Sequence, residues 1–200
     1  MVTTPDYTQA KTYAYDRLER ELSADLTYHN LWHTREDVVV ACRQIGQLSG
    51  LCQDELQLLE VGAAYHDIGF TEHRANHELA GARISAQVLP QFGFSQREIE
   101  CVMGMIIATR LPQSPRSLLE EIIADADLDV LGRDDFFARN KALREEWTNL
   151  GQKMGLKQWY EGQIAFLKSH TYFTPTARML RSEKKKQHII ELEEMLQRLA

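Results

Sequence analysis

The apolar residues of this chain recur at intervals of three and four along almost its whole length. That spacing gathers them on one side of an α-helix, whereas a half-buried strand would need strict alternation. The β-branched stretch 38–41 is the main strand-like signal, and it lies inside a helical repeat. We therefore predict an all-α protein. The first run shows the pattern clearly, with apolar side chains at Tyr7, Ala10, Ala14, Leu18 and Leu22.

Glycine and proline residues divide this periodic pattern into separate helices. The motifs T-R-E-D at 34–37 and S-Q-R-E at 95–98 resemble capping boxes, which mark helix starts. Because no repeat or low-complexity linker interrupts the chain, we predict a single domain over residues 1–200. The predicted helices cover about 7–22, 35–50, 54–66, 77–89, 95–107 and 117–131, followed by amphipathic stretches near 136–147, 158–167 and 176–199.

The composition excludes several classes of protein. Apolar residues make up 44% of the chain and charged residues 26%, which is typical of a soluble globular protein. A formal charge of −6 argues against general nucleic-acid binding, which needs excess Lys and Arg. No apolar run approaches the roughly 18 residues of a membrane span, and the first 22 residues do not resemble a secretory signal. The widely spaced Cys42, Cys52 and Cys101 indicate buried thiols, so we expect a cytoplasmic protein.

The dipeptide His66-Asp67 ends an apolar helix in the sequence A-A-Y-H-D-I-G-F. Burying two ionisable groups among such neighbours costs several kcal/mol unless they find partners. A bound metal ion is one standard partner for an imidazole beside a carboxylate. The position of the pair, more than the pair itself, marks it as a candidate metal site.

Three aspartates stand within five residues in I-I-A-D-A-D-L-D-V-L-G at 122–132. At 100° per residue, Asp125 and Asp127 point about 200° apart on a helix. Asp127 shares its face with Ile123, Ala124, Val130 and Leu131, and is therefore the candidate that points inward. Asp125 and Asp129 lie on a more polar face, where we expect surface groups or supporting groups behind a site.

These segments together resemble the HD superfamily of metal-dependent phosphohydrolases. The order is Y-H-N-L-W-H-T with His33, then A-A-Y-H-D-I-G with His66 and Asp67, then A-D-A-D-L-D with Asp127. The resemblance covers about residues 25–135 and is strongest to small bacterial HD-domain proteins. It implies that helices from 136 to 200 pack on or cap this core.

The resemblance implies a helical bundle with a metal site at its centre, formed by His33, His66, Asp67 and Asp127. Two imidazoles and two carboxylates suit one divalent ion such as Mn, Fe, Co, Ni or Mg. Such an ion activates water and polarises a phosphoryl group. We therefore expect a phosphohydrolase that cleaves a phosphate ester or anhydride, with a small phosphorylated substrate, most readily a nucleotide.

Other polar residues near the doublet are candidates for the remaining roles. Besides Asp67, the carboxylates of Glu72 and Glu78 are candidate catalytic groups that activate or orient water. Candidate substrate-binding residues are His77 and three arginines whose guanidinium groups match phosphate oxygens, Arg74, Arg110 and Arg133. An ordinary surface or helix-capping role is the alternative for each. We expect His29 to be structural or to support the site from behind.

Two other functions fit the same motifs. One is a regulatory HD module that binds metal or nucleotide without turnover, although such a module would be free to lose a ligand. The other is a two-iron oxygenase, which needs further histidine ligands. Only His73 and His77 lie between the doublet and Asp127, so a second metal is not expected. The sequence is compatible with a homo-oligomer and shows no membrane partner.

Overall fold

A computed structural model describes residues 4–199; residues 1–3 and 200, at the two ends of the predicted 1–200 domain, lie outside the described residues. Within 4–199 the chain forms nine α-helices and no strand, which confirms the predicted all-α fold. The helices are α1 (Tyr7–Glu21), α2 (Val39–Leu48), α3 (Gln53–Tyr65), α4 (His77–Val88), α5 (Gln96–Ala108), α6 (Leu118–Asp127), α7 (Phe136–Asn149), α8 (Leu156–Ser169) and α9 (Pro175–Gln197). Short helical turns connect them at η1 (His33–Val38), η2 (Ile68–Thr71), η3 (Leu89–Phe92) and η4 (Asp129–Gly132).

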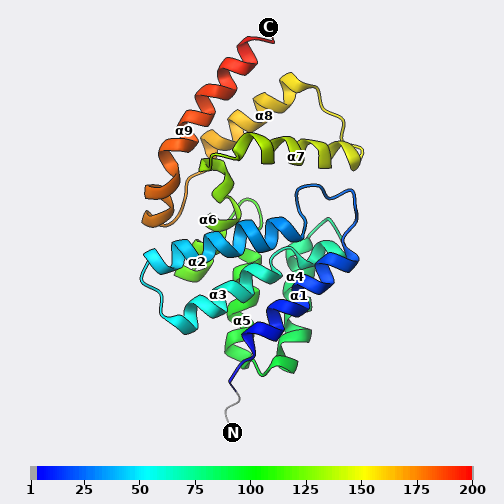
Figure 1. Cartoon of the computed structure of the whole chain (residues 1–200), viewed down its shortest axis with the longest axis vertical. Coiled ribbons are helices and arrows are strands. Elements are labelled where there is room, and N and C mark those ends of the chain that lie inside the picture. The colour runs from blue at the N-terminus through cyan, green and yellow to red at the C-terminus, as the bar shows by residue number, and fades with distance from the viewer. Residues whose placement is uncertain (1–3, 200) are drawn as a thin grey trace.

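The helices form two layers with separate apolar cores (Figure 1). Helices α1 to α6 pack around one cluster of buried side chains, which includes Leu59, Tyr65 and Ile106. Helices α7 to α9 lie over one end of this body and share a smaller cluster that includes Phe136, Leu167 and Leu192. The 3-10 turn η4 connects the layers, since it follows α6 and packs against α9.

The helix predicted to begin after Thr34 starts earlier. The chain is already helical at Trp32, and residues 33–38 form the π-helix η1 before α2 continues regularly. Thr34 is therefore buried inside a turn and cannot cap it, so the T-R-E-D prediction was wrong. A π turn holds one extra residue, and such turns are frequent at functional sites. The capping box at Ser95, by contrast, is confirmed, because Ser95 and Glu98 exchange the expected hydrogen bonds.

Helix α6 ends at Asp127, four residues before the predicted end. Asp125 does not lie on a polar surface as we expected. Its carboxylate is fully buried and accepts hydrogen bonds from the backbone N–H groups of Phe173 and Thr174 and from the Thr174 hydroxyl, at 2.7–2.8 Å. Since Thr174 in turn caps the N-terminus of α9, Asp125 fixes the start of that helix. Asp129 is also buried, and it pairs with Arg181 of α9.

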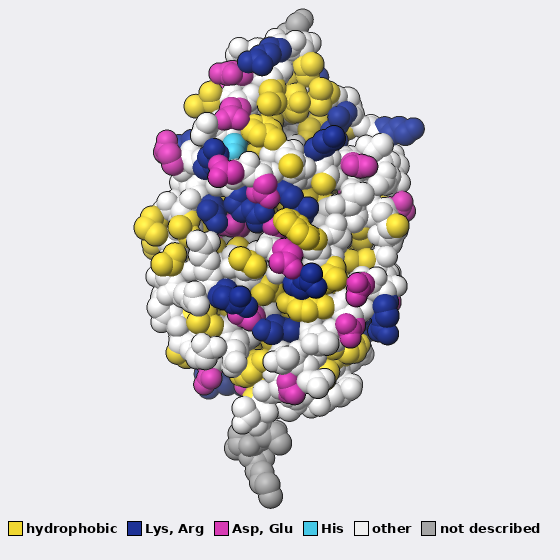
Figure 2. Space-filling model, in the orientation of Figure 1, with side chains coloured by type: hydrophobic (Ala, Val, Ile, Leu, Met, Phe, Trp, Pro, Cys, Tyr) yellow, Lys and Arg dark blue, Asp and Glu magenta, His cyan; other side chains and the backbone are white. Residues whose placement is uncertain are grey.

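The surface bears charges of both signs. On the face shown in Figure 2, Lys and Arg side chains are interspersed with Asp and Glu. None of the helices described in residues 4–199 is long and apolar enough to cross a bilayer. Of the three thiols predicted to be buried, Cys42 is buried, Cys101 is partly buried and Cys52 is exposed.

Candidate metal centre and the adjoining cavity

Three separate segments bring four polar side chains together. His33 comes from η1, His66 and Asp67 follow α3, and Asp127 is the last residue of α6. Asp67 Oδ2 lies 3.2 Å from His66 Nε2 and 3.8 Å from His33 Nε2. Asp127 Oδ1 lies 3.4 Å from His33 Nε2 and 3.5 Å from His66 Nε2. An ion with bonds of about 2.1 Å separates neighbouring ligand atoms by ~3 Å and opposite ones by ~4 Å, which matches these distances.

The hydrogen bonds of both imidazoles leave the inward nitrogen free. His66 Nδ1 donates to the carbonyl of Ala63 at 2.7 Å, and His33 Nδ1 faces the Asp37 carboxylate at 3.4 Å. Their Nε2 atoms and Asp67 Oδ2 are buried without a hydrogen-bond partner. Three buried polar atoms without partners that converge on one point are costly unless a cation joins them. His33, His66 and Asp127 could therefore hold a metal ion, and Asp67 Oδ2 lies beside them.

The charges of the four groups reinforce one another. Burial alone would lower the pKa of His66, but the negative charges of Asp67 and Asp127 hold it well above its ordinary value. Burial alone would raise the pKa of Asp67, but the neighbouring His66 holds it well below its usual range. The pKa of Asp127 is lowered in the same way by His33 and His66. Both aspartates are consequently carboxylates at neutral pH, the form that binds a cation.

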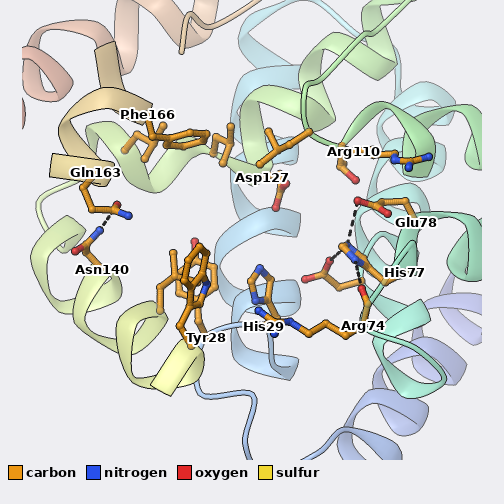
Figure 3. Close-up of a pocket in the computed structure, with 18 of the residues that line it drawn as sticks. Tyr28, His29, Arg74, His77, Glu78, Arg110, Asp127, Asn140, Gln163 and Phe166 are labelled. Atoms are coloured by element: carbon orange, nitrogen blue, oxygen red, sulfur yellow. Dashed lines mark hydrogen bonds and ion pairs between the residues drawn. The ribbon is translucent and has the colours of Figure 1, made fainter. Parts of the chain in front are cut away.

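A cavity of about 680 Å³ opens beside these four residues, between the two layers (Figure 3). Asp67 and Asp127 form part of its wall, so a ligand in the cavity reaches the candidate metal centre. Five of the predicted site residues lie around the same end: His77, Glu78, Arg74 and Arg110, together with Asp67 itself. His77 Nε2 is 3.4 Å from Asp67 Oδ1 and 3.7 Å from Glu78 Oε1, and its ring stacks on Phe70.

Two predicted site residues lie elsewhere. The exposed carboxylate of Glu72 forms ion pairs with Arg17 and Arg83 and is not part of the cavity wall. The Arg133 guanidinium binds Asp37 at 2.6 Å and also pairs with Asp135, so its charge is already neutralised behind His33. We therefore leave Glu72 and Arg133 out of the candidate catalytic and phosphate-binding groups.

The sequence did not reveal a pair of residues that meets beside the metal centre. Glu146 of α7 is buried and accepts hydrogen bonds from the backbone N–H groups of Tyr28 and His29 at 2.8 and 2.9 Å. Its second oxygen lies 2.5 Å from His29 Nδ1. Since His29 also lines the cavity, its Nε2 is the ring atom left for a ligand. The two residues are 117 positions apart, and no local pattern connects them.

Asp37 connects the candidate metal centre to the layer formed by α7 to α9. Its carboxylate forms ion pairs with Arg133 and with Arg139 of α7, whose Nη2 lies 3.1 Å from Asp37 Oδ2. The Arg139 guanidinium lies over the rings of Tyr28 and Trp32, at 4.7 and 4.6 Å from their centres. A carboxylate that orients a ligand histidine is a common supporting group in metal sites, and here it also holds α7 in place.

Comparisons with known proteins identify the fold. No protein-family model and no curated protein matches the sequence. A predicted HD superfamily hydrolase from an uncultured Thermotogales bacterium matches 98% of this chain and 94% of its own, with a TM-score of 0.67 and 20% identity. A Lactobacillus plantarum protein matches with a TM-score of 0.66 and 18% identity, over 98% of both chains. Bacillus subtilis YpgQ, solved in complex with ADP, matches 92% of this chain and 96% of its own, with a TM-score of 0.61 and 21% identity.

Proposed function

Because this chain has the fold of the HD superfamily hydrolases, we propose that it is a metal-dependent phosphohydrolase that cleaves a phosphate ester or anhydride of a nucleotide. One observation carries the proposal, namely the convergence of His33, His66 and Asp127, with Asp67 Oδ2 3.2 Å from His66 Nε2, beside a cavity of about 680 Å³. The likeness to YpgQ, which was solved in complex with ADP, supports a nucleotide as the ligand.

The four proposed ligands suit one divalent ion of intermediate or hard character, such as Mn, Fe, Co, Ni or Mg. When bound, the ion would act as a Lewis acid toward a phosphoryl oxygen and would lower the pKa of water. The protein contributes ligand atoms whose orientation is already fixed. His33 is fixed by Asp37, and His66 is fixed by the Ala63 carbonyl, so neither ring must turn to bind.

Two arginines that line the cavity are our candidates for binding the phosphate. Arg74 and Arg110 line the wall near His77, and Figure 3 shows all three on the same side of the pocket. Arg110 donates a hydrogen bond from Nη2 to Asn76, which holds its guanidinium in place. Two arginines match phosphate oxygens better than two lysines would, because each guanidinium presents paired donors. We assign phosphate binding to Arg74 and Arg110.

Glu78 and His77 are the groups we assign to water. Glu78 is 9% exposed, and its Oε1 lies 3.7 Å from His77 Nε2, which also faces Asp67. These contacts bring a carboxylate and an imidazole beside Asp67 at the wall of the cavity, which supports assigning them to the attacking water. A carboxylate so placed accepts the proton of the attacking water. The imidazole of His77 keeps that carboxylate and Asp67 in a fixed relation.

We assign proton donation to the leaving group to His29. Its Nδ1 lies 2.5 Å from the buried Glu146, and its Nε2 is left for the cavity. Burial alone would raise the pKa of Glu146, but its bonds to His29 lower it, so the carboxylate stays charged. A charged carboxylate behind an imidazole stabilises the imidazolium that gives up its proton during bond cleavage.

A screen for hydrolysis tests the proposed function. The purified chain, depleted of metal and then supplied with Mn²⁺, Co²⁺, Ni²⁺ or Mg²⁺ in turn, is assayed for phosphate release from nucleoside mono-, di- and triphosphates, cyclic nucleotides and simple phosphate esters. We expect hydrolysis that requires added metal and favours nucleotides. Metal binding without turnover on any of these compounds would instead support a regulatory module that keeps the site.

The role of His29 can be tested with leaving groups of different basicity. We expect His29→Gln to lower kcat about 10²-fold on a nucleotide that leaves as an alkoxide, because general acid catalysis of this kind contributes 10²–10⁴-fold. On 4-nitrophenyl phosphate, whose leaving group needs no proton, the loss should nearly vanish. Glu146→Gln should show the same pattern more weakly. The control is Glu145→Gln, at the exposed residue next to Glu146. Equal losses on both substrates in His29→Gln would refute the assignment.

A further inference from the structure

The cavity is much larger than phosphate binding requires. Away from the metal centre its wall is apolar and aromatic and comes mainly from α7, α8 and the turn before them. Such a wall offers flat apolar surfaces on which an aromatic ring can stack. The residues that form it are Leu128, Leu131, Phe136, Leu143, Trp147, Met154, Trp159 and Phe166.

Two amide side chains interrupt this apolar wall. Asn140 of α7 and Gln163 of α8 both line the cavity, and they are hydrogen-bonded to each other. Figure 3 places this pair at the end of the cavity opposite His77 and Glu78, with His29 and Asp127 between them. A polar pair inside an apolar wall is unfavourable unless its remaining donors and acceptors also find partners.

The orientation of both amides follows from one donor. Trp159 is buried, and its indole Nε1 can only donate, so the Asn140 atom 2.7 Å away is the oxygen Oδ1. Asn140 therefore turns its nitrogen toward Gln163, which accepts at Oε1. Gln163 is left with Nε2, for which no acceptor is present within residues 4–199. The three residues form a relay that presents an N–H donor, and not a carbonyl, to the cavity.

Gly162, the neighbour of Gln163, leaves space for a ligand at this position. It lies in the middle of α8, where a glycine costs about 1 kcal/mol relative to alanine. A Cβ built on it would meet no atom within 4 Å, so packing against the protein does not require the glycine. Since Gly162 also lines the cavity, its bare backbone lets a flat group approach the helix closely.

We infer that Gln163 determines which base the substrate carries, by donating a hydrogen bond from Nε2 to a carbonyl oxygen on the edge of a flat heteroaromatic ring. This inference rests on the proposed function, because it takes the phosphate end of the ligand to lie at the metal centre. The relay of Trp159, Asn140 and Gln163 would then select a keto base over the matching amino base. An amino group on the base in that place would point its own N–H donors at the N–H donor of Gln163.

The relay predicts that one substitution reverses the preference for the base. In Asn140→Asp both side-chain oxygens are acceptors, so Trp159 still donates to one of them while Gln163 must donate to the other. The Gln163 amide then turns over and presents Oε1 to the cavity. The preferred base should change from the keto to the amino form. In Gln163→Leu the donor is lost, and the discrimination should disappear.

The experiment measures binding of methylene-bridged nucleoside diphosphates to the Mn²⁺-loaded full chain by calorimetry. Two pairs differ mainly in a keto or an amino group, inosine against adenosine and uridine against cytidine, and methylenediphosphonate serves as the probe without a base. For the pair whose ring size fits the wall, the wild-type protein should bind the keto member about tenfold more tightly, as expected for one hydrogen bond. Asn140→Asp should reverse this ratio, and Gln163→Leu should bring it near one.

The control is Gln158→Leu, an exposed glutamine on the same helix that does not line the cavity. It should leave every affinity unchanged. A wild-type preference for the amino members, no preference in either pair, or a keto preference that persists in Gln163→Leu would overturn the inference. Keto selection without any hydrolysis would overturn only the proposed function, and hydrolysis without base selection would overturn only this inference. If Asn140→Asp does not fold, the wild-type and Gln163→Leu ratios still decide.

Discussion

Asp67→Asn is expected to reduce metal-dependent hydrolysis by about 10³-fold or more while the protein keeps its helical content. The substitution conserves shape, but it replaces a charged ligand by a neutral one beside two imidazoles whose Nε2 atoms lie 3.2 and 3.8 Å away. Metal chemistry supplies several kcal/mol of transition-state stabilisation, and each 1.36 kcal/mol corresponds to a tenfold change in rate. Phosphate release in the presence of Mn²⁺ and far-ultraviolet circular dichroism measure the two quantities.

The control for this substitution is Asp54→Asn. Asp54 lies exposed at the start of α3, the helix that carries His66 and Asp67 at its other end. The same chemical change there should leave activity unaltered. Hydrolysis by Asp67→Asn at a rate near that of the wild type, with normal circular dichroism, would show that Asp67 is not a ligand.

Asp125→Ala is expected to cause a large loss of stability. The change removes a fully buried carboxylate and leaves two backbone N–H groups and the Thr174 hydroxyl without an acceptor. Losing one partner of a buried charged network costs about 3–5 kcal/mol. For a chain of this size we expect Tm to fall by about 6–20 °C in a calorimetric scan.

The structural reason for this loss lies in α9. Thr174 caps the helix and is held by Asp125, so the substitution frees the start of α9 from α6. Because α9 packs on α8, which carries Gln163, binding at the far end of the cavity should weaken together with stability. Asp134→Ala is the control, because that exposed carboxylate forms a single surface pair with Lys184 and should give no measurable change. A Tm equal to that of the wild type in Asp125→Ala would contradict the anchoring role.

The features that depend on neighbouring residues could be predicted from the sequence. Helical periodicity predicted the all-α fold, and the motif at Ser95 predicted the start of α5 correctly. Helical geometry predicted that Asp127 points inward, and the structure places Asp127 beside His33 and His66. The same rules failed at Thr34, because the chain is already helical before it and continues as a π turn. A capping motif marks a helix start only where the preceding residue is not helical.

The features that depend on distant residues could not be predicted. Asp125 was placed on a polar surface because its helical neighbours are polar, but its partners lie 48 and 49 residues away in the chain. Glu146 carries no local sign of burial, since the adjacent Glu145 is exposed in the same helix. Arg133 matched a phosphate clamp in type, yet Asp37 and Asp135 already bind it. Each of these outcomes is decided by which helices meet, and periodicity within one helix does not contain that information.

The aromatic residues of the C-terminal helices show the same limit. Spacing could not distinguish packing in a core from the wall of a pocket, and the structure places both functions in one segment. Phe136 packs into the upper core and also lines the cavity, while Trp159 is buried and orients Asn140. Whether an aromatic residue packs in the core or lines the cavity depends on how α7 and α8 lie over the candidate metal centre. The contacts of Asp37 with Arg139, and of Glu146 with Tyr28, fix the position of α7.

The most direct test of this account is the position of a bound ion. Crystals of the wild-type chain soaked in Mn²⁺ and measured at the manganese absorption edge would locate it by anomalous scattering. We expect one strong peak within bonding distance of His33 Nε2, His66 Nε2, Asp67 and Asp127, and no peak there in crystals of Asp67→Asn. A strong peak elsewhere, or no peak among these four side chains at millimolar Mn²⁺, would contradict this expectation.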